Sequence, residues 1–211
     1  MVKKHIPGLV IALLLIGIGF YYDQHIDSGL IEEVPNTRLA VVEGYQFKDS
    51  RLIKQNEKAL NFYKRQDFEN CVKTYEDMII DGPEEPGSYA GLGTCQMWLN
   101  DHDGAEYNFT MALKFAPNSV RALNGLGAVA SKRKNYETSI DYYKKSLKSN
   151  TNYVSSHEGI AYVYTKTHQY ELAEKHYKKV LKLVPDTEMA ARSEERLQEI
   201  QKQKIEQQEF N

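Results

Sequence analysis

The chain has 211 residues, of which 41% are hydrophobic and 27% are charged, and its formal net charge is −2. Length and composition are those of a folded chain with about one domain and a further segment. The nearly balanced charge, together with the lack of a Lys/Arg run, argues against a nucleic-acid partner.

The first feature in chain order is an uncharged run of 17 residues, 6–22, with Lys3 and Lys4 before it and Asp23 and Asp27 after it. As a helix, this run would be about 25 Å long, at the short end of what crosses a bilayer. We therefore predict a single N-terminal transmembrane helix.

The flanking charges predict its orientation. Positive residues stay on the cytoplasmic side, so residues 1–5 would be cytoplasmic and 6–22 would be a signal anchor of the inner membrane. The rest of the chain would then lie on the periplasmic or extracytoplasmic side. A cleaved signal peptide is the alternative, because Gly17 and Gly19 suit a cleavage site. Both readings export the remainder of the chain.

Residues 23–51 follow, with Gly29, Pro35 and Gly44 but no long apolar period. We predict a partly ordered tether that holds the next domain close to the membrane. Its stretch 39–47, LAVVEGYQF, is alternatively a short strand or helical turn that lies on that domain.

A fixed period of 34 residues organises the chain from residue 52 to residue 187, and Pro83, Pro117, Thr151 and Pro185 mark it. Such a period is typical of helix-turn-helix arrays. The blocks are 52–85, 86–119, 120–153 and 154–187.

Within the blocks, the eighth and twentieth residues are small, as two closely crossing helices require. The twenty-fourth residue is aromatic in every block, and turn residues separate the two predicted helices. The eighth residues are Ala59, Gly93, Gly127 and Ala161; the twentieth are Cys71, Ala105, Ser139 and Ala173; the twenty-fourth are Tyr75, Phe109, Tyr143 and Tyr177; the turns are 66–67, 100–101, 134–135 and 168–169.

This pattern resembles the tetratricopeptide repeat family. The resemblance implies an all-α superhelix, an α-solenoid of four helix-turn-helix repeats, in which Gly93 and Gly127 mark the contact within a hairpin. Residues 188–211 follow, and their apolar residues Met189, Leu197 and Ile200 share one helical face. We predict a C-terminal capping helix and tail there, because a last repeat exposes an apolar edge.

The resemblance also implies a peptide-binding groove on the concave side of the superhelix. Three glycines in it, at the sixth residue of successive blocks, would let a ligand backbone approach the helices closely. The alternative is that these positions are merely tolerant. The predicted groove residues are Asn56, Leu60, Tyr63, Gly91, Thr94, Met97, Trp98, Arg121, Asn124, Gly125, Lys132, Glu158, Gly159, Tyr162 and Lys166, with Lys64, Ala90, Ala128 and Thr165 at matching positions.

Chemistry other than binding finds little support in the sequence. Cys71 and Cys95 lack metal or redox spacing, and they are either two buried thiols or a disulfide between repeats. The six histidines are scattered, and we find no catalytic motif. We expect no enzyme, cofactor or metal site.

The sequence therefore predicts a membrane-anchored scaffold or adaptor that binds a protein or peptide during assembly or maturation of an envelope complex. The alternative is a structural protein that forms a homo-oligomer by stacking its repeats or C-terminal helices.

Overall fold

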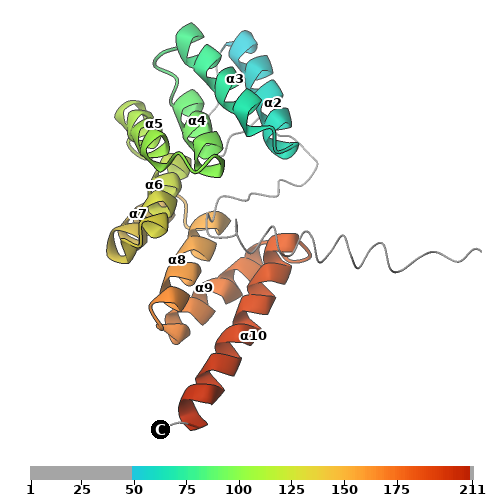
Figure 1. Cartoon of the computed structure of the whole chain (residues 1–211), viewed down its shortest axis with the longest axis vertical. Coiled ribbons are helices and arrows are strands. Elements are labelled where there is room, and N and C mark those ends of the chain that lie inside the picture. Colours follow the sequence, from blue (N-terminus) through green and yellow to red (C-terminus); the bar gives the residue numbers. More distant parts are fainter. Residues whose placement is uncertain (1–48, 210–211) are drawn as a thin grey trace, which may run out of the picture.

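The computed structural model describes residues 49–209, which form nine helices and no strand (Figure 1). The predicted segments 1–5 and 6–22, and the tether up to residue 48, lie outside this range. Within 49–209, no helix combines the length and apolar character needed to cross a membrane. The helices are α2 (Ser50–Lys64), α3 (Phe68–Asp81), α4 (Pro86–Trp98), α5 (His102–Phe115), α6 (Val120–Lys132), α7 (Tyr136–Ser149), α8 (Val154–Lys166), α9 (Tyr170–Leu183) and α10 (Glu188–Glu209).

Four helical hairpins, α2–α3, α4–α5, α6–α7 and α8–α9, stack into a solenoid, as predicted (Figure 1). The first helix of a hairpin also contacts the first helix of the next one, α4 with α6 and α6 with α8. The first helices therefore form the inner layer of the curve, where neighbouring repeats come closest together, and the second helices form the outer layer.

The turns inside the hairpins recur with the sequence period. Gln66, Asn100, Lys134 and His168 have φ values of 59°, 59°, 61° and 58°, so each turn ends its first helix in the left-handed region. The predicted turn positions are thus confirmed. α2 begins at Ser50, two residues before the predicted block, because the Asp49 side chain accepts a hydrogen bond from the Arg51 N–H as an N-cap.

The core of the two middle repeat junctions is an aromatic ring between two glycines. A Cβ added to Gly93 would lie 2.9 Å from the ring of Phe109, and one added to Gly125 would lie 2.3 Å from the same ring. In the same way, a Cβ added to Gly127 of the same hairpin, or to Gly159 of the next hairpin, would clash with the ring of Tyr143. Gly93 and Gly127 therefore mark the helix contact within a hairpin, as predicted.

The second set of glycines has a different role from the predicted one. Gly125 is buried under the ring of Phe109, and Gly159 is buried under the ring of Tyr143. Gly91 lies under the ring of Tyr75, and a Cβ added to this glycine would be 2.3 Å from that ring. The prediction that these glycines line the groove is wrong. They hold no side chain because the preceding repeat fills that space with an aromatic ring.

α10 takes the place that the first helix of a fifth repeat would have. Ser193 stands 34 residues after Gly159 and is 1% exposed. Ile200 is fully buried in one cluster with Tyr177. The Arg192 guanidinium lies 3.6 Å from a carboxylate oxygen of Glu158 on α8. This helix thus covers the apolar end of the array.

Cys71 on α3 and Cys95 on α4 form a buried disulfide with a Cα–Cα distance of 6.1 Å. Of the two alternatives left by the sequence, the structure therefore has the covalent link between the first and second repeats.

Replacing Gly125 with Ala should destabilise the protein, although Ala favours helices by about 1 kcal/mol. The new methyl group would meet the Phe109 ring, and overpacking of this kind costs about 1–3 kcal/mol. Urea unfolding measures the change, with the exposed Thr110→Ala on α5 as the control. In a protein that already carries Phe109→Leu, Gly125→Ala should lower the free energy of unfolding by less, because the new methyl group and the Phe109 ring compete for the same space. A more stable Gly125→Ala protein would contradict the packing role.

Replacing both cysteines with Ala should lower the free energy of unfolding by about 3 kcal/mol, because the disulfide closes a loop of 24 residues. A reductant should shift the unfolding midpoint of the original protein toward that of the variant and leave the variant unchanged. Equal unfolding midpoints of the original protein with and without reductant would show that the disulfide contributes nothing to stability.

Candidate functional site: the concave face

The helix contacts assign each face of the inner helices. Residues six and eight of a block meet aromatic rings of the second helices. Residue five lies between helices: Asn124 accepts a hydrogen bond from Ser156 Oγ of the next inner helix at 3.0 Å. The remaining sector holds residues nine and thirteen, and we call these residues the concave line. They are Leu60, Lys64, Thr94, Trp98, Ala128, Lys132, Tyr162 and Lys166.

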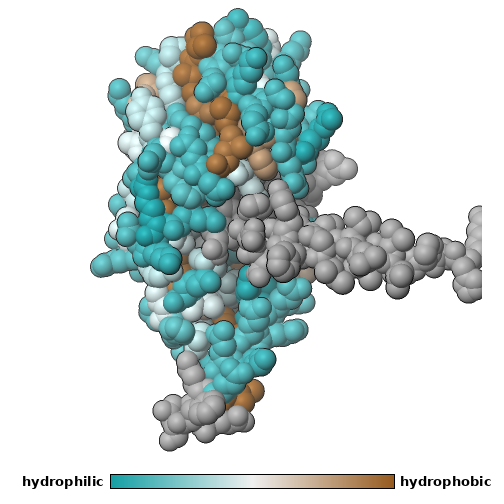
Figure 2. All heavy atoms as spheres, in the orientation of Figure 1, coloured by the Kyte–Doolittle hydropathy of each residue, from teal (hydrophilic) through white to brown (hydrophobic). Residues whose placement is uncertain are grey.

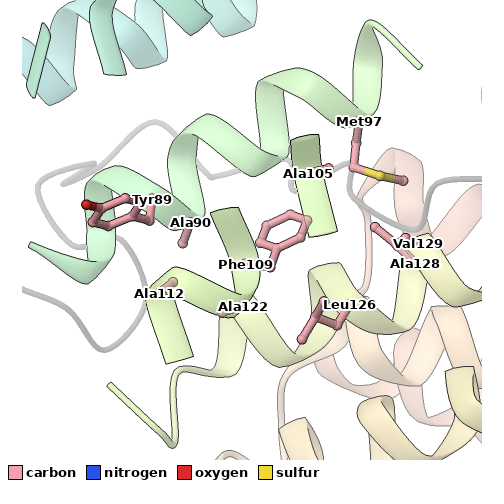
Figure 3. Packing of buried hydrophobic residues seen from close by; sticks show 10 residues of the cluster. All are labelled: Tyr89, Ala90, Met97, Ala105, Phe109, Ala112, Ala122, Leu126, Ala128 and Val129. Atoms are coloured by element: carbon pink, nitrogen blue, oxygen red, sulfur yellow. The ribbon is translucent and has the colours of Figure 1, made fainter. Parts of the chain in front are cut away.

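Several predicted groove residues lie between helices instead. Asn56 and Asn124 are 2% and 1% exposed, and the Asn56 side-chain oxygen accepts a hydrogen bond from the Tyr75 hydroxyl at 2.9 Å. Met97 is 2% exposed and packs in one cluster with Ala128 and Val129 between α4 and α6 (Figure 3). For these three residues the predicted role in the groove is wrong, because Asn124 and Met97 join neighbouring inner helices and Asn56 faces the outer helix α3 of its own hairpin.

Thr94 is a partial exception. It belongs to the concave line, but it is 6% exposed, and its hydroxyl donates to the Ala90 carbonyl oxygen at 2.8 Å. Its hydroxyl is thus already used by the backbone of its own helix.

An aromatic cluster closes one end of the concave line. The Trp98 indole N–H donates to the Tyr63 hydroxyl at 2.8 Å, and the indole stacks on Phe68 with 5.3 Å between ring centroids. Trp98 and Tyr63 are half-buried, so part of each ring can contact a ligand. Phe68 was not among the predicted groove residues, although the seventeenth residue of every block carries a ring, and this repeated type was the signal that could have found it. The residues are Phe68, His102, Tyr136 and Tyr170.

Positive charge runs along the thirteenth residues. Lys64, Lys132 and Lys166 occupy this position in three of the four blocks. The Lys166 ammonium lies 5.2 Å from the centre of the Tyr162 ring, a cation–π distance. These cations give the concave line a positive edge beside apolar and aromatic groups.

The nearest acidic and basic groups of the inner layer are engaged with other residues. Burial raises the pKa of Glu158, while the nearby Arg192 acts in the opposite direction. Arg121, a predicted groove residue, is half-buried and lies close to the Tyr75 hydroxyl, whose pKa is raised by burial and lowered in part by this guanidinium. Glu158 therefore adds little free negative charge, because Arg192 neutralises it.

A histidine pair joins the two helices of the fourth repeat. His157 Nδ1 and His176 Nδ1 are 2.9 Å apart, and His157 Nε2 lies 3.1 Å from the Thr151 carbonyl oxygen. The carbonyl can only accept, so His157 carries its proton on Nε2 and accepts from His176 on Nδ1. Burial lowers the pKa of both, that of His176 to about 4, and His157, Lys175 and Lys144 add to the effect on His176.

The comparisons with known proteins agree with this architecture. Residues 120–153 and 154–187 match the family model of the tetratricopeptide repeat, with the same bounds as two predicted blocks. Protein CTR9 homolog of Arabidopsis thaliana is 26% identical over 131 residues, which are 60% of this chain and 12% of that protein. The chain thus spans about an eighth of the length of this curated relative.

Solved structures share the fold at low identity. TTC0263, a thermophilic TPR protein of Thermus thermophilus, has a TM-score of 0.64 at 17% identity, covering 71% of this chain and 80% of that one. For pilF of Pseudomonas aeruginosa the TM-score is 0.63 at 16%, with coverage of 74% and 69%. For MamA it is 0.52 at 16%, with coverage of 70% and 96%. The described residues therefore form a tetratricopeptide-type α-solenoid.

Acid should destabilise the fourth repeat through His176. Its pKa is 6.5 when unfolded and about 4 when folded, so the unfolded chain binds the proton more tightly. Stability is therefore full above about pH 6.5 and falls between pH 6.5 and pH 4. In His176→Gln this loss should be smaller in unfolding curves recorded across that range. His168→Gln is the matched control, because Gln66 occupies the same turn position in the first repeat; equal acid losses in all three proteins would contradict this role.

Proposed function

We propose that this protein is a membrane-anchored scaffold that binds an extended segment of a partner protein along its concave line and recruits it for assembly or maturation of an envelope complex. Binding, rather than catalysis, is its activity. Tetratricopeptide solenoids form extended concave surfaces that suit this use.

The observation that carries the proposal is the chemistry of the concave line. Aromatic groups that anchor a partner, Trp98 and Tyr162, alternate there with the cations Lys132 and Lys166. Aromatic side chains are frequent centres of binding energy, while charges set orientation and specificity. The favoured partner segment is thus apolar with acidic residues.

Two observations support an extracytoplasmic location. The sequence predicts an anchor at residues 6–22 with positive residues before it and acidic residues after it. The buried Cys71–Cys95 disulfide fits an oxidising compartment, where such bonds form and persist. We therefore place the repeats on the periplasmic side of the inner membrane.

Self-assembly is the second candidate, and the exposed apolar side chains favour it. Ile205 on α10 is 55% exposed beside an apolar depression that Leu197 also lines. Ile80 at the end of α3 is 79% exposed, and a hydrophobic stripe runs over that end of an otherwise largely hydrophilic face (Figure 2). Contacts between copies at these sites would bury apolar surface outside the concave line.

Photo-crosslinking in the native host tests both candidates. A photoreactive amino acid replaces Trp98 or Tyr162 on the concave line, and the exposed Lys144 on α7 serves as the outer control. The adducts are identified by mass spectrometry. We expect one distinct envelope protein from the concave positions and none from Lys144.

Adducts that consist of a second copy of this chain would instead favour self-assembly. Equal labelling from Lys144 and from the concave positions would overturn the groove as the working surface.

A further inference from the structure

We infer that the outer face of the third and fourth repeats is a docking surface for an anionic phospholipid bilayer. The surface is formed by lysines in the C-terminal parts of α7 and α9, and we call it the basic face. It rests on the proposed function only through the predicted anchor, which would hold the repeats beside a bilayer. The lysines of the basic face are Lys144, Lys145, Lys148, Lys175, Lys179 and Lys182.

The lysines lie on the side of their helices that points away from the core. Lys175, Lys179 and Lys182 are spaced i, i+4 and i+7, so they share one side of α9. The buried residues of α9 are on the opposite side, and α7 has the same arrangement. Of the six lysines, Lys179 is half-buried and the others are exposed. The basic face therefore belongs to the outer layer and leaves the concave line free for a partner.

The two rows of lysines act together on the histidine pair between them. Burial, together with His157, Lys175 and Lys144, lowers the pKa of His176 to about 4. Burial also lowers the pKa of His157, and Lys179 adds to this effect. Since Lys144 comes from α7 and the other two lysines come from α9, the positive potentials of both helices overlap at this pair. The two rows thus form one continuous charged surface.

The charge of the basic face is not neutralised within the described part of the chain. None of its six lysines forms an ion pair with a residue in 49–209. The neighbouring Glu174 is engaged elsewhere, because its carboxylate lies 3.5 Å from the Lys178 ammonium and 3.0 Å from that of Lys204. An anionic surface from outside would therefore meet uncompensated positive charge.

Helix stability alone does not require this distribution of charge. Lysines near a helix C-terminus are favoured by the helix dipole, yet α3 has no basic residue in its last turn and ends at Asp81. Residues 25, 26 and 29 of a block are all lysine in the last two blocks, but two of them are acidic in the first. They are Lys144, Lys145 and Lys148 in block three, Lys178, Lys179 and Lys182 in block four, and Glu76, Asp77 and Ile80 in block one.

Apolar side chains beside the lysines favour a bilayer as the partner. Leu172 is 42% exposed, and it precedes Lys175 by three residues and Lys179 by seven, so it lies on the same side of α9. Lys178 lines an apolar depression together with Ile205 of α10, which is 55% exposed. Such a combination is typical of surfaces in the headgroup region, where lysines meet phosphates and apolar groups meet acyl chains. A soluble phosphate would use only a few of these charges.

Acetylation of lysines in the full-length chain tests the inference. The protein is reconstituted at one copy per lipid nanodisc, with phosphatidylglycerol and phosphatidylcholine or with phosphatidylcholine alone. A water-soluble acetylating reagent is added, and mass spectrometry maps the modified lysines. On anionic discs, acetylation of the basic face should fall severalfold, and this protection should vanish at about 1 M salt, where the Debye length is about 3 Å. Three exposed lysines elsewhere should react equally on both discs: Lys54, Lys73 and Lys114.

Three outcomes would overturn the bilayer as the partner. The first is equal acetylation of the basic face on both kinds of disc. The second is protection on neutral discs by added inorganic phosphate, which would assign the surface to a soluble phosphate. The third is protection on neutral discs that grows with protein concentration, which would assign it to a second copy of the chain.

Fluorescence quenching by lipids with a nitroxide group gives an independent measurement. Both cysteines of the chain are in the disulfide, so a fluorophore on Ser149→Cys at the end of α7 labels a single thiol. Quenching should be severalfold stronger on anionic than on neutral discs. The two matched variants are Lys144→Gln/Lys148→Gln/Lys182→Gln, which should abolish this difference, and Lys54→Gln/Lys73→Gln/Lys114→Gln, which should retain it. An equal loss in both variants would show an effect of net charge alone and would contradict a docking face.

Failure of this inference is distinguishable from failure of the recruiting role. Adducts of an envelope partner at Tyr162 without protection of the basic face would leave the recruiting role intact and remove the bilayer contact. Protection of the basic face without any partner adduct would do the reverse.

Discussion

The whole array depends on one repeated contact, an aromatic ring from an outer helix held between small residues of successive inner helices, both of which are glycines at the two middle junctions. Phe109 and Tyr143 each occupy such a site. Full burial of one large side chain contributes about 1.5–3 kcal/mol, whereas the two helical glycines beside it together cost about 2 kcal/mol. The ring therefore offsets the weaker helices that it requires, and it joins two repeats at once. Between the first and second repeats, the Cys71–Cys95 disulfide adds a covalent connection at the same kind of junction.

This contact also determines what is left for binding. Residues five, six, eight and twelve of the inner helices pack against other helices. The residues that are left to face a ligand are mainly residues nine and thirteen, the concave line. A ligand in this groove meets a narrow row of side chains rather than a broad floor. Recognition must then come from a few groups, the Trp98 cluster at one end and the lysines along the edge.

The sequence was sufficient for the fold because the period of 34 sets both the turns and the small residues. The sequence was insufficient to assign the groove residues, because positions on one turn of an inner helix face three different neighbouring helices. The glycines at residue six illustrate the difference. The first block has the exposed Glu57 there, since no outer helix precedes it within the described residues, and α10 has the buried Ser193. That change at the two ends was the available signal that the position serves packing between repeats. The pairing of His157 with His176 had no such signal, because it depends on how α8 and α9 pack.

A groove with a net positive edge cannot distinguish well between two apolar, acidic segments by charge alone. Selection among such segments must then come from how well their apolar side chains fit beside Trp98 and Tyr162, because aromatic side chains are frequent centres of binding energy.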